Sequence, residues 1–107
     1  MYIAMNRFTV ARGREEEFEN IWRSRNSYLD EVPGFVSFHL LRGATNESST
    51  LFLSHSQWES EAAFVGWTKS DAFRSAHKNA KSPKGVLLGH PVFEGYAAVD
   101  LCQSGSD

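Results

Sequence analysis

Residues 35–58 read FVSFHLLRGATNESSTLFLSHSQW, and this stretch decides the fold. Two runs rich in apolar and aromatic residues, 35–42 and 50–58, flank a polar loop at 43–49, which is the pattern of two strands joined as a β-hairpin. Alternation within the first run places Phe35 and Leu41 on one face of its strand. It places Val36, Phe38 and Leu40 on the other face.

A strand and a helix are predicted before this hairpin. Residues 2–10 alternate, so that one face of the strand carries Tyr2, Ala4, Phe8 and Val10. Residues 14–29 carry apolar side chains at helical spacing, with acidic residues at the start and Arg23 and Arg25 near the end, as the helix dipole favours. The sequence Val32-Pro33-Gly34 then ends the helix.

A second helical region and a fourth strand are predicted after the hairpin. Ser60 is placed to cap a helix over 61–67, and Ser70 is placed to cap another over 71–79. Residues 80–91 contain prolines and glycines and are predicted to form a loop, and residues 92–101 are predicted to form the last strand. The order β-α-β-β-α-β predicts a single ferredoxin-like α+β domain over 1–107, with one four-stranded antiparallel sheet and helices on one face.

The other face of this sheet also looks apolar in the sequence. An apolar sheet face left in water would form a large exposed patch, so a second copy of the chain is expected to cover it. Two sheets that close on each other in this way form a dimeric α+β barrel, and a homodimer is therefore predicted.

Composition excludes several classes of protein. The net charge of −2 argues against a nucleic-acid partner, since such proteins usually carry a basic excess. Cys102 is the only cysteine, so the chain has no intramolecular disulfide and cannot build a zinc or iron–sulfur site on thiolates. We find no secretory signal and no apolar run of membrane-spanning length, and we therefore expect a cytoplasmic protein without a membrane partner.

Three residues stand out as candidates for chemistry, and each also has an ordinary structural interpretation. Asn6 lies in phase with the apolar face of its strand, where its amide either bonds a neighbouring backbone group or addresses a polar atom of a ligand. Trp67 ends a short helix and is either a core residue or the edge of a pocket. His77 lies one helical turn after Phe73. It is either an ordinary core or surface residue or an axial ligand of a haem iron, a role that suits an imidazole in an apolar setting.

The segment that carries Phe64, Trp67, Lys69-Ser70-Asp71, Phe73 and Ala76-His77-Lys78 resembles the signature region of the IsdG family of haem-degrading monooxygenases. This family lies within the antibiotic-biosynthesis-monooxygenase superfamily. Met5-Asn6-Arg7, Pro33-Gly34-Phe35 and Trp58-Glu59-Ser60 resemble the superfamily as well, so the likeness covers nearly the whole domain. The combination of Asn6, Trp67 and His77 is its discriminating part.

The resemblance implies a role for each member of this triad. His77 is similar to the proximal ligand of the haem iron, and Asn6 to the amide that donates a hydrogen bond on the oxygen side of the haem. Trp67 is similar to the bulky side chain that bends the porphyrin out of plane. Further contacts to haem are expected from Phe64, Trp22, Phe73 and Arg25.

The resemblance also implies the reaction. Haem would be both cofactor and substrate, an external reductase or small reductant would supply electrons, and O₂ would open the ring and release iron for iron acquisition. The basic stretch from Lys69 to Lys84 is then expected to meet the haem propionates, or else to form a solvated helix face. Two alternatives remain open, since fold alone does not decide function: a cofactor-independent monooxygenase that oxidises a polycyclic phenol to a quinone, and a non-enzymatic haem-binding protein.

Overall fold

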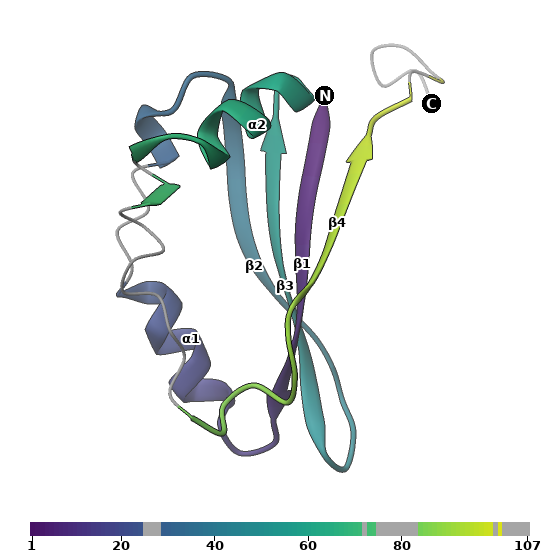
Figure 1. Cartoon of the computed structure of the whole chain (residues 1–107). Helices are drawn as coiled ribbons and strands as arrows, with labels where there is room; N and C mark the ends of the chain where they lie inside the picture. Colours follow the sequence, from purple (N-terminus) through teal and green to yellow (C-terminus); the bar gives the residue numbers. More distant parts are fainter. Residues whose placement is uncertain (25–28, 72, 75–83, 100, 102–107) are drawn as a thin grey trace.

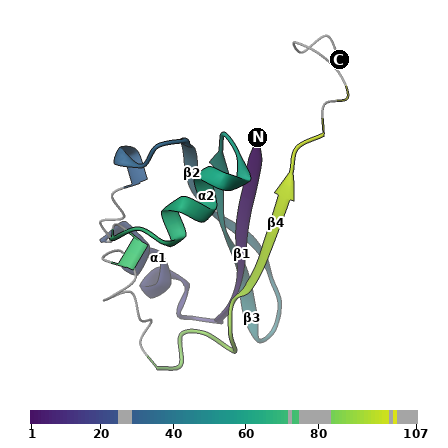
Figure 2. The ribbon, with the colours of Figure 1, turned by 45° about the horizontal axis from the view of Figure 1, so that its top comes forward.

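The computed structural model describes residues 1–24, 29–71, 73–74, 84–99 and 101. A four-stranded antiparallel sheet of order β2-β3-β1-β4 carries both helices on one side (Figure 1, Figure 2). The elements are β1 (Tyr2–Ala11), α1 (Glu15–Arg23), the 3-10 helix η1 (Leu29–Glu31), β2 (Phe35–Thr45), β3 (Ser49–Trp58), α2 (Glu61–Thr68) and β4 (Val92–Ala97). The predicted ferredoxin-like α+β fold is therefore confirmed.

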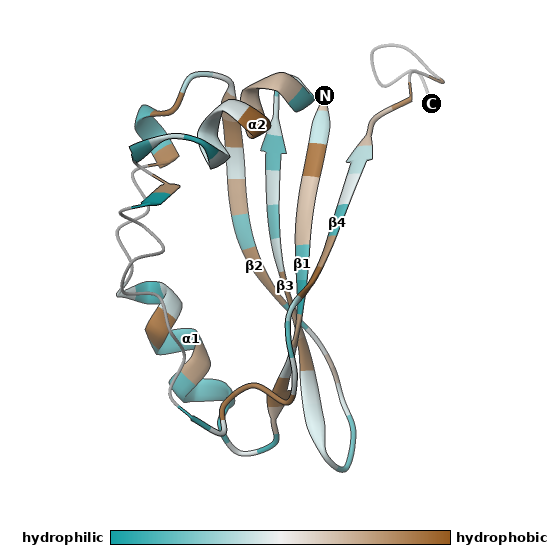
Figure 3. Cartoon of the chain, viewed as in Figure 1, coloured by the Kyte–Doolittle hydropathy of each residue, from teal (hydrophilic) through white to brown (hydrophobic). Residues whose placement is uncertain are grey.

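The central strand β1 has the two faces that its alternating sequence predicts. Tyr2, Ala4 and Val10 are buried on the helix-covered face, whereas Arg7 and Thr9 on the other face are exposed. Figure 3 shows the hydropathy changing from residue to residue along β1 and β2. We call the side of the sheet that carries the helices the covered face and the opposite side the open face.

The predicted phase of β2 is wrong at its first residues. The register of β2 against β3 shifts between Phe35 and Ser37, so one extra residue lies in β2 at that point. Such a bulge turns the residues before it to the other face. Phe35 therefore packs with Phe38 against the buried core, while Val36 is 47% exposed.

The first helix is shorter than its apolar stripe predicts. α1 ends at Arg23, and the Ser24 hydroxyl donates to the Ile21 carbonyl at 2.9 Å, which competes with continuation of the helix. Leu29, the predicted last residue of the stripe, lies instead in the separate 3-10 helix η1, where it is buried. Residues 25–28 lie outside the described part of the chain.

The turn before β2 and the start of α2 form where the sequence predicts them. Gly34 has a φ of +84°, and a Cβ at that position would collide with the Cβ of Ala63 on α2. Ser60 caps α2 by accepting from the Ala63 N–H at 3.1 Å. The Ser70 hydroxyl accepts from the Phe73 N–H at 3.1 Å, as predicted for a helix cap. Of the helix predicted over 71–79, residues 72 and 75–79 lie outside the described residues.

Part of the predicted loop at 80–91 belongs to the core. Within its described residues, 84–91, Val86 is fully buried and its carbonyl accepts from the Ala11 N–H at 2.8 Å. Leu87 pairs with Val10 as an isolated β-bridge. The glycines around this segment are typical of a loop, so the sequence did not predict that it packs in the core. β4 is also shorter than predicted, since it ends at Ala97 rather than near Leu101.

The open face is mixed rather than uniformly apolar. Arg7 donates to Glu94 at 2.8 Å across β1 and β4, and this hydrogen bond and charge hold the pKa of Glu94 below its usual value. His39 and His55 are paired across β2 and β3. The register places apolar side chains around these polar groups, namely Ile3, Met5, Leu41, Leu53, Val92 and Tyr96.

Candidate functional site

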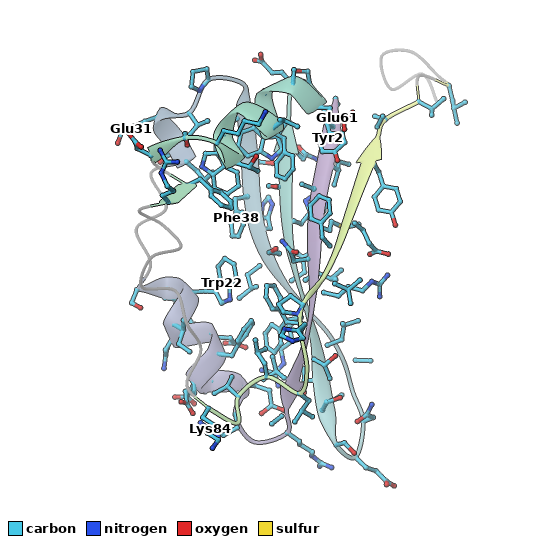
Figure 4. The ribbon with its side chains drawn as sticks, viewed as in Figure 1. Tyr2, Trp22, Glu31, Phe38, Glu61 and Lys84 are labelled. Atoms are coloured by element: carbon cyan, nitrogen blue, oxygen red, sulfur yellow. The ribbon has the colours of Figure 1, made fainter. Side chains whose placement is uncertain are left out.

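The covered face carries two groups of aromatic side chains. The first, which we call the Trp58 cluster, lies against α2 and comprises Tyr2, Phe35, Trp58, Phe64, Trp67, Phe73 and Phe93. The second, the Phe18 cluster, lies against α1 and comprises Phe8, Phe18, Trp22, Phe38 and Phe52. Figure 4 shows Tyr2 near α2 and Trp22 reaching from α1 toward the sheet.

A band of small and polar residues separates the two clusters on the sheet. On β1 it consists of Ala4 and Asn6, and on β3 of Ser54 and Ser56, which face them in register. Ser54 and Ser56 are 6% and 8% exposed. On β1 and β3 the centre of the covered face is therefore polar, and it is bordered by Phe38 and Leu40 of β2 and by Phe93 of β4.

Asn6 lies in the middle of this band, in the strand phase predicted for it. Its register partners are Ser54 on β3 and Phe93 on β4, so all three side chains project from the covered face. Asn6 is half-buried. Within the described residues the Asn6 amide makes no side-chain hydrogen bond, so the structure does not show the bond to a neighbouring backbone group that the ordinary interpretation requires.

Trp67 is packed in the Trp58 cluster. Its ring centroid lies 5.4 Å from that of Trp58 and 6.1 Å from that of Phe64, and the ring of Phe73 meets it edge-on at 4.8 Å. Phe73 and Trp67 are both half-buried. These contacts fix the indole at the end of α2, with part of its surface left uncovered.

Two further aromatic residues expected at the site also lie on the covered side. Phe64 stacks on Phe93 with centroids 5.7 Å apart and an interplanar angle of 11°. Trp22 stacks on Phe38 with centroids 5.6 Å apart, and the two rings approach each other between α1 and β2 (Figure 4). The structure therefore brings Asn6, Trp67, Phe64, Phe73 and Trp22 to the same side of the sheet.

His77 and Arg25 lie outside the described residues, and so do Lys78 and Lys81. In the part of the chain that is described, no three histidine, cysteine, aspartate or glutamate side chains gather to hold a metal ion. Of the basic stretch, Lys69 and Lys84 are exposed, and Arg74 pairs with Asp71 on the same helical turn. The described residues thus supply an aromatic surface and one amide, which suit a flat apolar ligand with a polar centre.

Ser54 and Phe93 are not among the residues that the sequence singled out. Phe93 is placed beside Asn6 by the pairing of β1 with β4, and Ser54 by the pairing of β1 with β3. A signal was present for Ser54, because this serine is in phase with the buried residues Phe52 and Trp58.

No helix in the described part of the chain is long and apolar enough to cross a membrane.

Known proteins are similar to this chain in sequence and in fold. Residues 1–79 match the antibiotic biosynthesis monooxygenase family. A "heme oxygenase (staphylobilin-producing)" of Staphylococcus haemolyticus is 29% identical over 79 residues, which are 74% of this chain and 75% of that protein.

Two solved structures show that the fold supports more than one chemistry. The haem degrader MhuD from Mycobacterium tuberculosis, with two haems bound, has a TM-score of 0.70 at 24% identity and covers 95% of this chain and 100% of its own. SnoaB from Streptomyces nogalater, a cofactor-independent oxygenase, has a TM-score of 0.66 at 19% identity, with 96% and 97% covered. At these identities the likeness to both structures shows the fold alone.

Proposed function

The chain belongs to the antibiotic biosynthesis monooxygenase family, and from this premise we propose that it is a haem-degrading monooxygenase. Haem is the proposed substrate. O₂ and electrons from an external donor are consumed, the porphyrin ring is opened and the iron is released. The staphylococcal relative named as a haem oxygenase supports this choice within the family.

One structural observation carries the proposal: a single amide, Asn6, lies between two aromatic clusters on the covered face. A porphyrin is flat and apolar, so aromatic side chains suit its faces and edges. The reacting centre is polar, and it needs a hydrogen-bond donor where charge develops. We therefore assign that donor role to Asn6.

Three residues take defined parts in the proposed site. His77 holds the haem iron, and Asn6 donates a hydrogen bond on the oxygen side. Trp67 is fixed by Trp58, Phe64 and Phe73, and it therefore presents a rigid edge that can press on the porphyrin. Distortion of the ring and hydrogen bonding near the iron are two of the means by which a protein controls haem. Arg25 and the basic residues between Lys69 and Lys84 are proposed to meet the propionates.

Addition of hemin to the purified protein tests the function directly. We expect a shifted Soret band at one haem or more per chain, followed by bleaching when ascorbate is added in air. A shifted band that does not bleach with ascorbate or with a reductase system would indicate a haem-binding protein without the activity. No interaction with hemin would contradict the proposal.

The second candidate is a cofactor-independent monooxygenase of polycyclic phenols, because SnoaB, which has the same fold, is a cofactor-independent oxygenase. Such an enzyme also uses an aromatic-lined site but has no need of an iron ligand at His77. Formation of a quinone from an anthrone, without haem and without change in the His77→Ala variant, would support this candidate over haem degradation.

Asn6→Ala is expected to bind haem and to degrade it slowly. The amide is assigned to the oxygen side, so its loss should lower the rate per bound haem more than the affinity. By analogy with a lost oxyanion-hole donor, the cost is about 2–4 kcal/mol of transition-state stabilisation. Hemin titration and single-turnover bleaching measure the two effects separately. An equal loss of affinity and rate would identify Asn6 as a structural residue.

A homodimer that buries the open face is the proposed assembly. Leu53 lies on that face beside exposed Leu41, its partner in β2, so Leu53→Arg should convert the dimer to a monomer. Val65 is exposed on α2, on the other side of the sheet, and Val65→Arg is the matched control. Light scattering at micromolar concentration gives the mass of each variant. A monomeric parent chain would refute the assembly.

A further inference from the structure

We infer that the Ser54 hydroxyl positions the Asn6 amide when haem is bound, an inference that rests on the proposed function. Ser54 is the direct partner of Asn6 in the β1–β3 register. Directly opposed residues of antiparallel strands have Cβ atoms about 4.5–5.5 Å apart and project from the same face. The serine hydroxyl is thus within reach of the amide without movement of the backbone.

The neighbours of Asn6 on the sheet leave Ser54 as the group that can hold the amide. On the covered face, Ala4 and Phe8 flank Asn6 along β1, and Phe93 lies beside it on β4. None of these three side chains has a hydrogen-bond donor or acceptor. Ser54 is the only polar side chain among the immediate strand neighbours of Asn6.

Ser54 is buried but is not committed to another partner in the described residues. Its exposed fraction is 6%, and none of the side-chain hydrogen bonds among the described residues involves its hydroxyl. The Asn6 amide makes no side-chain hydrogen bond in the described residues either, so a bond between the two groups would use the free hydrogen-bonding capacity of both.

The neighbouring serine behaves differently and serves as a control. The Ser56 hydroxyl donates to the Ala4 carbonyl at 3.2 Å and accepts from Trp58 Nε1 at 2.9 Å. Both of its hydrogen-bonding functions are therefore used within the core. Ser54 and Ser56 share residue type, strand and face, and differ in whether the hydroxyl is committed.

The orientation of the amide decides what Asn6 can do. An asparagine presents a carbonyl oxygen on one side and an NH₂ group on the other. When the Ser54 hydroxyl donates to Asn6 Oδ1, the NH₂ group is directed away from β3 and toward the ligand. Without that bond the amide can rotate and present its oxygen, which would repel the developing negative charge instead of stabilising it.

Two measurements on Ser54→Ala test this role, with Ser56→Ala as the matched control. We expect Ser54→Ala to bind hemin with unchanged affinity and to degrade it about fivefold more slowly per bound haem, the effect of one lost neutral hydrogen bond. Ser54→Thr keeps a hydroxyl and should restore the rate. Ser56→Ala should lower the melting temperature and leave the rate per bound haem unchanged.

The second measurement does not depend on turnover. Gallium protoporphyrin IX is diamagnetic and cannot be degraded in this way, so the Asn6 side-chain amide signals can be recorded by NMR in its complex. We expect these signals to shift in Ser54→Ala much more than in Ser56→Ala. Equal rates and equal signals in the parent chain and Ser54→Ala would overturn the positioning role, whereas a parent chain that leaves hemin intact would overturn the proposed function instead.

Discussion

Trp67→Ala is expected to bring haem degradation nearly to a stop while haem still binds. If the indole presses on the porphyrin, its removal leaves a flatter and less reactive ring. The variant should also lose about 3 kcal/mol of stability, near the lower end of the range for removal of a large aromatic side chain, because Trp67 is only half-buried. The rate per bound haem and the melting temperature, measured on the same samples, separate the two effects.

Phe35→Ala is the control for loss of packing alone. Phe35 belongs to the same aromatic cluster, and its ring centroid lies 5.5 Å from that of Trp58. It lies on β2, whereas Trp67 lies on α2. It should lower stability by a comparable amount and leave the rate per bound haem unchanged. Trp67→Phe should fall between the parent chain and Trp67→Ala in rate. Resonance Raman spectra that show equal ruffling of haem in Trp67→Ala and the parent chain would reject the mechanical role.

His77→Ala is expected to abolish coordination of the haem iron and, with it, turnover. A neutral imidazole is the iron ligand that the resemblance implies for this position, and alanine offers no replacement. The Soret spectrum during hemin titration reports the ligand directly, and circular dichroism reports whether the fold persists. We expect the fold to persist.

His90→Ala is the matched histidine control, because His90 is exposed just before β4. It should retain the spectrum and the rate of the parent chain. If His77→Ala also retains both, the ligand assignment is wrong and the cofactor-independent oxygenase becomes the better account of the site.

Much of the fold could be predicted because local patterns agree with the final packing. The two-residue period of β1 placed Asn6 on the covered face, and Ser60 marked the start of α2. The bulge near Phe35 could not be predicted, because it inserts one residue into a pattern that otherwise reads as a regular strand. Val86 was missed for a related reason: nearby glycines are typical of a turn, whereas its burial comes from packing with Val10, Phe18 and Phe52, which are far away in the sequence.

The candidate site was predictable only in part. Asn6, Trp67 and Phe64 were found because each stands out on its own strand or helix. Ser54 became visible only when the register of β1 against β3 was known, since the pairing of strands far apart in the sequence does not follow from the period of either strand. The pairing of side chains across the sheet is therefore the part of this site that could not be predicted from the sequence.

The polar band on β1 and β3 separates two buried cores, which Phe38 of β2 still joins because it packs against the Trp58 cluster and stacks on Trp22. The Phe18 cluster is closed by α1 and the Trp58 cluster by α2. We expect the regions under α1 and α2 to open locally with different free energies. A ligand that spans both clusters would couple them, so hydrogen exchange in α1 and in α2 should become correlated when the site is filled.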